Sequence, residues 1–234
     1  MLAIFKRELR SYFTSPMGYI FCAVFLLVNN LFFYLINIYS QISDLTSLFS
    51  NMLFMLLFII PLLTMRSLSE ESKQQTDQLL LTSPVNIWEI VVGKFFAAMC
   101  VFLIALFGTL VWPLIVTMYG NPAAYTIIGN YVAVIFATMT FISVGIFISS
   151  LTKSQIVSAI ISYCAFLAIY FLQSVAQIVD QPLVQNVLNF FSIFTRYQNI
   201  MLGLFSLADI VYYISFTVVF LFLTTRVIEK KRWA

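Results

Sequence analysis

Long apolar runs separated by short polar segments make up most of the chain. Six runs are long enough to cross a membrane as helices, because about 20 apolar residues span the ~30 Å hydrocarbon core of a bilayer. Each run is continuous, whereas the strands of a membrane β-barrel alternate over ~10 residues. The predicted spans are Met17–Ile38, Leu48–Met65, Ile87–Met118, Ile127–Ser150, Ile156–Ile178 and Ile210–Ile228. The pattern therefore predicts an all-α integral membrane protein with six transmembrane helices.

Composition supports the same class of protein. Hydrophobic residues make up 62% of the chain and charged residues 9%, whereas a soluble domain is about 25% charged. No Gly- or Ser-rich linker divides the sequence, so residues 1–234 are expected to form a single transmembrane domain surrounded by membrane lipid. No basic stripe is interleaved with exposed aromatic residues, so we expect no nucleic-acid partner.

The basic residues lie on alternate sides of the predicted spans. All but one of the 12 Lys and Arg residues fall on the side that carries both termini, and the exception is Arg196. In this count Lys94 belongs, with Arg66 and Lys73, to the segment after the second span. The positive-inside rule then places both termini in the cytoplasm, in a multi-pass protein of the cell membrane.

Residues 1–15 predict a helix that lies in the membrane interface. Apolar side chains recur at helical spacing and basic ones are available for the polar face, which suits an anionic leaflet: Leu2, Phe5, Leu9 and Tyr12 against Lys6, Arg7 and Arg10. Pro16 would end this helix and begin the first span. A simple topology anchor is the alternative interpretation.

Residues 179–208, on the outer side, are too long for a tight loop and too apolar for a solvated one. Apolar residues again recur at three- and four-residue spacing, namely Val184, Val187, Leu188, Phe191 and Phe194. We expect one or two short extracytoplasmic helices that dip into the outer leaflet or cap a pathway, because irregular backbone at membrane depth must be satisfied by protein or water. An interfacial helix without a gating role is the alternative.

Several catalytic and energy-coupling motifs are absent from the sequence. Without histidine, no Ser/His/Asp set or H-E-x-x-H motif is present, and no G-x-x-x-x-G-K-[ST] loop could hold ATP phosphates. Cys22, Cys100 and Cys164 lie in apolar runs without paired spacing, so no metal site is expected. No span has a convincing charged residue near its middle, as ion-coupled carriers usually do. The chain is therefore expected to be non-catalytic, and energy for transport must come from a partner protein.

The segment between the second and third spans, residues 66–86, is the predicted contact for that partner. Ser67 and Glu70 form a capping-box pattern, which starts a helix, and Ser83–Pro84 would end it. A short charged helix joined rigidly to two spans could transmit force. On these residues alone, an ordinary solvated loop is an equal alternative.

The same segment carries a resemblance to a known family. The stretch Glu70-Glu71-x4-Thr76-x2-Leu79-Leu80-Leu81-Thr82-Ser83-Pro84-Val85, followed by Trp88 and Gly93-Lys94, resembles the signature of ABC-2 type transporter permeases, and within them the gliding-motility (GldF-like) subgroup. Residues 5–16, 145–155, 209–215 and 231–233 resemble further stretches of that group, in the same order. Gln75 and Asp77 depart from the Gly and the apolar residue that the family often has there.

The resemblance implies a type V exporter-like permease fold with defined accessory helices. Residues 1–15 would be the elbow helix, residues 66–86 the cytoplasmic coupling helix, and residues 179–208 the extracytoplasmic gate. The residues implied in contact with the ATPase are Glu70, Glu71, Thr76, Leu79, Leu80, Leu81, Pro84, Thr152 and Gln155, and those implied in the gate are Phe191, Phe194 and Arg196.

The resemblance also implies partners. Two permease subunits, identical or related, would stand above two copies of an ABC ATPase, and ATP and Mg would bind in the ATPase rather than in this chain. An extracytoplasmic auxiliary protein is a further expected partner. The function implied is transport driven by ATP hydrolysis in a separate subunit, and the family leans to export. The alternative is a force-transmitting or structural subunit that relays ATPase motion to an extracytoplasmic partner without moving a substrate.

Polar residues inside the predicted spans are candidates for a substrate pathway. They are Asn51, Ser158, Ser162 and Gln173. Interhelical hydrogen bonds are the alternative role for such residues. Gly145 and Ser149 form a small-xxx-small pair, which allows a close contact between two helices.

Overall fold

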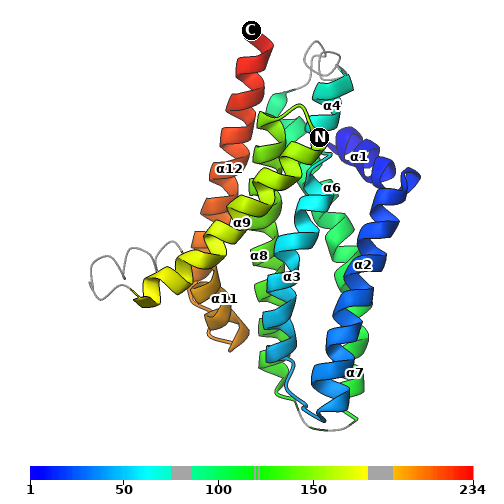
Figure 1. The fold of residues 1–234 in the computed structure, drawn as a ribbon, viewed down its shortest axis with the longest axis vertical. Coiled ribbons are helices and arrows are strands. Elements are labelled where there is room, and N and C mark those ends of the chain that lie inside the picture. The colour runs from blue at the N-terminus through cyan, green and yellow to red at the C-terminus, as the bar shows by residue number, and fades with distance from the viewer. Residues whose placement is uncertain (75–85, 119, 121, 179–191, 234) are drawn as a thin grey trace.

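The computed structural model describes residues 1–74, 86–118, 120, 122–178 and 192–233, and these residues form helices joined by short connections (Figure 1). Among them lie α1 (Leu2–Thr14), α2 (Pro16–Phe33), α3 (Thr46–Thr64), α4 (Ser69–Gln74), α6 (Ile87–Phe107), α7 (Val111–Val116), α8 (Ala124–Leu151), α9 (Gln155–Ile178), α11 (Ile193–Met201) and α12 (Leu207–Trp233). A π-helical turn, Tyr34–Tyr39, extends α2, and a 3-10 turn, Gly108–Leu110, joins α6 to α7.

Five of the helical stretches are long and apolar enough to cross a membrane. They are Pro16–Tyr39, Thr46–Lys73, Ile87–Val116, Ala124–Leu151 and Leu207–Lys231. These confirm the first four predicted spans and the last one as apolar helices. The predicted fifth span corresponds to α9, in which Gln155–Phe171 forms a shorter apolar helix. The count of six spans therefore stays a prediction.

The long helices form a bundle with α8 at its centre. In Figure 1, α2, α3, α6, α8 and α12 run along the long axis, while α9 leans away from the bundle. Helix α8 packs against α3, α6, α9, α11 and α12. In its most apolar window 72% of the residues are buried, against 22% for the α2 stretch and 28% for α12. Helices α2 and α12 therefore present most of their surface to the surroundings of the bundle.

Small residues let α8 approach its neighbours closely. A Cβ atom at Gly145 would lie 2.8 Å from the Cβ of Thr64 on α3 and closer still to the Thr64 hydroxyl. Such a distance is well below ordinary contact, so only glycine fits this crossing. The close helix contact predicted from Gly145 and Ser149 is thus confirmed, and the partner is the end of α3.

The predicted helix over residues 1–15 is present as α1, which lies across one end of the bundle (Figure 1). Ser15 is extended, with φ −91° and ψ 156°, and Pro16 is the first residue of α2, as predicted. A Cβ at Gly18 would lie 2.7 Å from the Tyr12 carbonyl oxygen, so the bend needs a residue without a side chain there. Helix α1, helix α4 and both ends of the chain lie at this end, which we call the terminal end.

Candidate functional site

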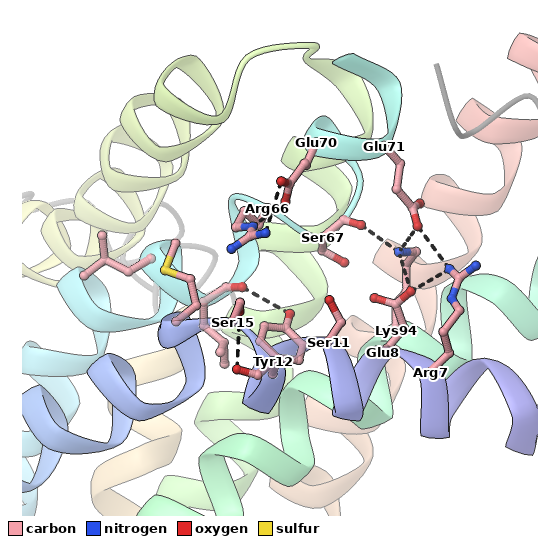
Figure 2. A pocket seen from close by; sticks show the side chains of 13 residues that line it. Arg7, Glu8, Ser11, Tyr12, Ser15, Arg66, Ser67, Glu70, Glu71 and Lys94 are labelled. Carbon is pink, nitrogen blue, oxygen red and sulfur yellow. Dashed lines mark hydrogen bonds and ion pairs between the residues drawn. The ribbon is translucent and has the colours of Figure 1, made fainter. Parts of the chain in front are cut away.

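Four charged side chains from three helices meet at the terminal end (Figure 2). They are Arg7 and Glu8 on α1, Glu71 on α4 and Lys94 on α6, and we call them the charge cluster. The Lys94 Nζ lies 2.9 Å from Glu71 Oε1 and 3.2 Å from Glu8 Oε1. It also donates a hydrogen bond of 2.8 Å to the Ser67 carbonyl. The Lys94 ammonium thus joins α6 to both α4 and α1.

Arg7 completes the charge cluster. Its Nη2 lies 2.7 Å from Glu8 Oε1 and 3.1 Å from Glu71 Oε1. Two cations therefore balance two carboxylates. Burial lowers the pKa of Arg7, but hydrogen bonds and charges from Glu8 and Glu71 outweigh it, so this pKa is raised above its usual value. Arg7 thus stays charged and keeps its ion pairs with Glu8 and Glu71.

The packing of α1 on α6 explains why Lys94 can be buried. A Cβ at Gly93 would lie 3.1 Å from Ile4 Cγ2, so α1 rests directly on this turn of α6. Glycine keeps the two helices close, and Lys94 beside it is only 1% exposed. A buried ammonium is tolerated only when it is paired and hydrogen-bonded. The charge cluster and the Ser67 carbonyl supply these partners.

The position of Lys94 corrects the sequence interpretation. The charge count grouped Lys94 with the basic residues of the segment after the second span, although the predicted third span begins at Ile87, and the structure places Lys94 inside α6, buried. Hydropathy could not show this, because its partners Glu8 and Glu71 come from distant parts of the chain. Arg7, Glu8 and Lys94 were not among the predicted site residues. The available signal was a lysine following glycine inside an apolar run.

A cavity of about 400 Å³ lies next to the charge cluster, between α1, the end of α3 and α4 (Figure 2). Arg66 and Glu70 line it and form a bidentate ion pair, in which Arg66 Nη2 lies 3.0 Å from Glu70 Oε1. The Tyr12 hydroxyl donates a hydrogen bond of 3.2 Å to the Leu63 carbonyl. Burial raises the pKa of Tyr12, so its hydroxyl keeps the proton that it donates. These bonds attach α1 to the end of α3 as well.

Helix α8 fixes the start of α4. The Ser149 Oγ accepts hydrogen bonds from the amides of Leu68 and Ser69, at 3.1 and 3.0 Å, and donates to the Met65 carbonyl at 3.2 Å. The capping-box prediction began the helix at Ser67, whereas α4 begins at Ser69. The reason is tertiary: a hydroxyl on a neighbouring helix accepts from the first amides of α4.

The structure places the described members of the predicted ATPase contact at the terminal end. Glu70 pairs with Arg66 and Glu71 lies in the charge cluster, while Thr152 and Gln155 lie at the turn between α8 and α9. Helix α4 contacts both α8 and α9, so the two predicted contact regions adjoin. The remaining predicted members lie outside the described residues: Thr76, Leu79, Leu80, Leu81 and Pro84.

The predicted gate contains one described helix, α11. Arg196 Nη1 lies 2.7 Å from Asp209 Oδ1, and the guanidinium stands 4.4 Å from the centre of the Tyr212 ring. Phe194 is buried, with its ring 4.8 Å from that of Tyr170. Phe191 lies outside the described residues. Two of the three predicted gate residues therefore attach α11 to α12 and α9.

The predicted pathway residues do not share one cavity in the described part of the chain. Asn51 lines a cavity of about 370 Å³ with Tyr170, Phe194 and Gln198. Ser158 and Ser162 are fully buried on α9, and their hydroxyls find no hydrogen-bond partner among the described residues. Gln173 lies on α9, and its side chain is outside the described part. Asn51 therefore lines a cavity together with Phe194 of the predicted gate, and this cavity does not include Ser158 or Ser162.

These features define a multi-pass membrane protein with a buried ion-pair site at one end of its bundle. The model of the family described as "ABC-2 family transporter protein" matches residues 2–232, so the chain belongs to this family. Members are in general the non-catalytic membrane components of ABC transporters, which work with an ATPase partner. The sequence matches no curated protein.

Proposed function

We propose that this chain is the permease subunit of an ABC transporter that exports a substrate across the cell membrane. A separate ATPase would supply the energy. The family match supports the permease role, and the charge cluster is the observation that carries the coupling mechanism. The terminal end would face the cytoplasm, and the GldF-like subgroup remains our proposal for the closest relatives within the family.

The charge cluster would pass the motion of the ATPase to several helices at once. Residues 66–86 would form the coupling segment, and Glu71 near its start is bonded through Lys94 to α6 and through Arg7 to α1. A displacement of α4 would therefore move α1 and α6 with it. Packed helices tend to switch between two arrangements rather than deform continuously. ATP binding and hydrolysis would alternate the permease between two such arrangements.

The proposed assembly contains two permease subunits, identical or related, and two ATPase subunits that hold ATP and Mg. Helix α11 would belong to the extracytoplasmic gate, fastened to α12 by the pair Arg196–Asp209. An extracytoplasmic auxiliary protein would be a further partner. Thr152 and Gln155 would form the second, smaller contact with the ATPase.

A force-transmitting subunit without a transported substrate is the second candidate. The observation that favours it is that Ser158 and Ser162 are fully buried, whereas Asn51 lines a cavity that does not include them. Inside-out vesicles holding the complete complex distinguish the two functions. ATP-dependent accumulation of any substrate supports transport, while ATP hydrolysis that changes only the extracytoplasmic partner supports force transmission.

The experiment that tests the proposal is affinity purification of the tagged chain from its native membrane in mild detergent. An ABC ATPase should co-purify, and the complex should hydrolyse ATP. Leu80→Asp should remove the ATPase. Leu202→Asp, at an exposed position in the loop between α11 and α12, should retain it. Glu71→Gln should retain the ATPase but weaken its stimulation by the permease, because Glu71 joins α4 to Lys94 and Arg7 in the charge cluster. Unaided nucleotide turnover by the purified chain would refute the proposal.

A further inference from the structure

An apolar groove of about 410 Å³ lies between α1 and α6, beside the charge cluster but separate from it. Its lining is wholly apolar and includes Phe5 on α1 together with Phe96, Met99, Cys100 and Leu103 on α6. A volume of this size is typical of ligand pockets, which lie between about 300 and 1,000 Å³. The groove is therefore large enough to hold a ligand and is larger than a packing defect.

The groove opens on the membrane side of α6. Phe96 and Leu103 line it and are both about two-fifths exposed, and α6 belongs to one of the five helical stretches able to cross a bilayer. The eight residues from Phe96 to Leu103 extend roughly 10 Å along the helix axis. The groove thus begins beneath α1 and follows α6 into the hydrocarbon region.

Two exposed cations, Lys6 and Arg10, lie on α1, the helix whose Leu2 and Phe5 line the groove. Leu2, Lys6 and Arg10 follow one another at four-residue spacing on α1, which places them in one row along the helix. All three are exposed, and Leu2 also lines the groove. In the described part of the chain, the side chains of Lys6 and Arg10 form no ion pair, in contrast to Arg7 in the charge cluster.

We propose that this groove binds an acyl chain of an anionic phospholipid of the membrane, whose headgroup phosphate contacts Lys6 and Arg10. An apolar slot lined by Leu2 and Phe5, with two exposed cations on the same helix, offers a partner to each end of such a lipid. The bound lipid would fill the space between α1 and α6 and hold α1 against Gly93. The inference depends on the membrane location of the chain and is independent of any ATPase partner.

Native mass spectrometry of the purified chain tests this site with two lipids that share the same acyl chains, phosphatidylglycerol and phosphatidylcholine. At low salt, about thirtyfold more phosphatidylglycerol should be retained, because the two basic residues near the headgroup contribute roughly 1 kcal/mol each. The double variant Lys6→Gln/Arg10→Gln should bring this ratio close to one. Lys153→Gln/Lys230→Gln, two exposed lysines away from the groove, is the matched charge control.

The apolar part of the site is tested by filling the groove. Cys100→Phe should lower the retention of both lipids, whereas Cys164→Phe, the same change at an exposed position on α9, should not. If Cys100→Phe fails to fold, Leu103→Asn places an amide in the groove at a partly exposed position and should have the same effect.

Three results would overturn the inference. The first is equal retention of the two lipids by the unchanged chain. The second is normal lipid retention after the groove has been filled. The third is a loss of dimer mass in Cys100→Phe without any loss of lipid, because a second copy of the chain would then be the occupant.

Discussion

Replacing Lys94 with methionine, which has nearly the same length, should destabilise the fold by removing its ion pairs in the charge cluster and its hydrogen bond to the Ser67 carbonyl. Lys94 pairs with Glu71 at 2.9 Å and with Glu8 at 3.2 Å. At an effective dielectric constant of about 20, each pair is worth roughly 5 kcal/mol. Returning the lysine to water recovers several kcal/mol of desolvation cost, while two mostly buried carboxylates then share Arg7 alone, so the net loss should be about 3 kcal/mol.

Thermal unfolding in detergent micelles measures this loss. For a chain of this size, about 1 kcal/mol shifts the midpoint by roughly 2–4 °C, so Lys94→Met should unfold about 6–12 °C below the wild type. The matched control is Arg226→Met, which removes an exposed ion pair with Glu229 and should cost less than about 1 kcal/mol. Exposure of Arg226 is 63%, so solvent already screens that pair.

The double variant Lys94→Met/Glu71→Gln separates charge from packing. Removing one of the two carboxylates that share Arg7 should recover at least half of the lost stability, because Arg7 then pairs with Glu8 alone. If Lys94→Met unfolds at the same midpoint temperature as the wild type, the charge cluster does not stabilise this end of the bundle. A double variant that is less stable than Lys94→Met would show that packing, rather than charge balance, determines the loss.

Three further predictions concern other parts of the fold. Gly145→Ala should cost about 1–3 kcal/mol by overpacking α8 on α3, measured as a lower unfolding midpoint, and adding Thr64→Ala, which removes the hydroxyl and methyl of Thr64 but keeps its Cβ, should recover part of it; no recovery would contradict the close contact. Arg196→Gln leaves Asp209 buried without its cation, so α11 should exchange amide hydrogens faster and Asp209→Asn in the same chain should reverse this; unchanged exchange would contradict the role of the ion pair. A cysteine replacing Lys230 should react with a membrane-impermeant maleimide only from the cytoplasmic side, and labelling of intact cells would reverse the proposed topology.

The hydropathy pattern predicts the apolar helices well because each of them depends mainly on its own residues. A helix in lipid satisfies its backbone internally, so its existence and length follow from a single continuous run. The bend before α2 was predictable for the same reason, since Pro16 and its neighbours act locally. The contact at Gly145 was predictable as a close approach, although the sequence did not reveal that its partner is Thr64.

The charge cluster was not predictable in this way. Its members come from residues 7, 8, 71 and 94, and only the tertiary fold brings them together. A solvated lysine and a buried lysine with three polar partners have the same hydropathy, so the pattern could not show that Lys94 is buried and paired. The same limit applies to α4, where the hydroxyl of Ser149 accepts from amides about 80 residues earlier in the chain.

The bend at Ser15 turns α2 into an arm carried by α1. Helix α2 contains 18 residues, which makes it about 27 Å long. A tilt of about 10° at the bend would therefore displace its far tip by roughly 5 Å. Because most of α2 is exposed rather than wedged among other helices, lipid would yield to such a swing. A small rotation of α1 would thus move the far end of α2, at the other side of the membrane.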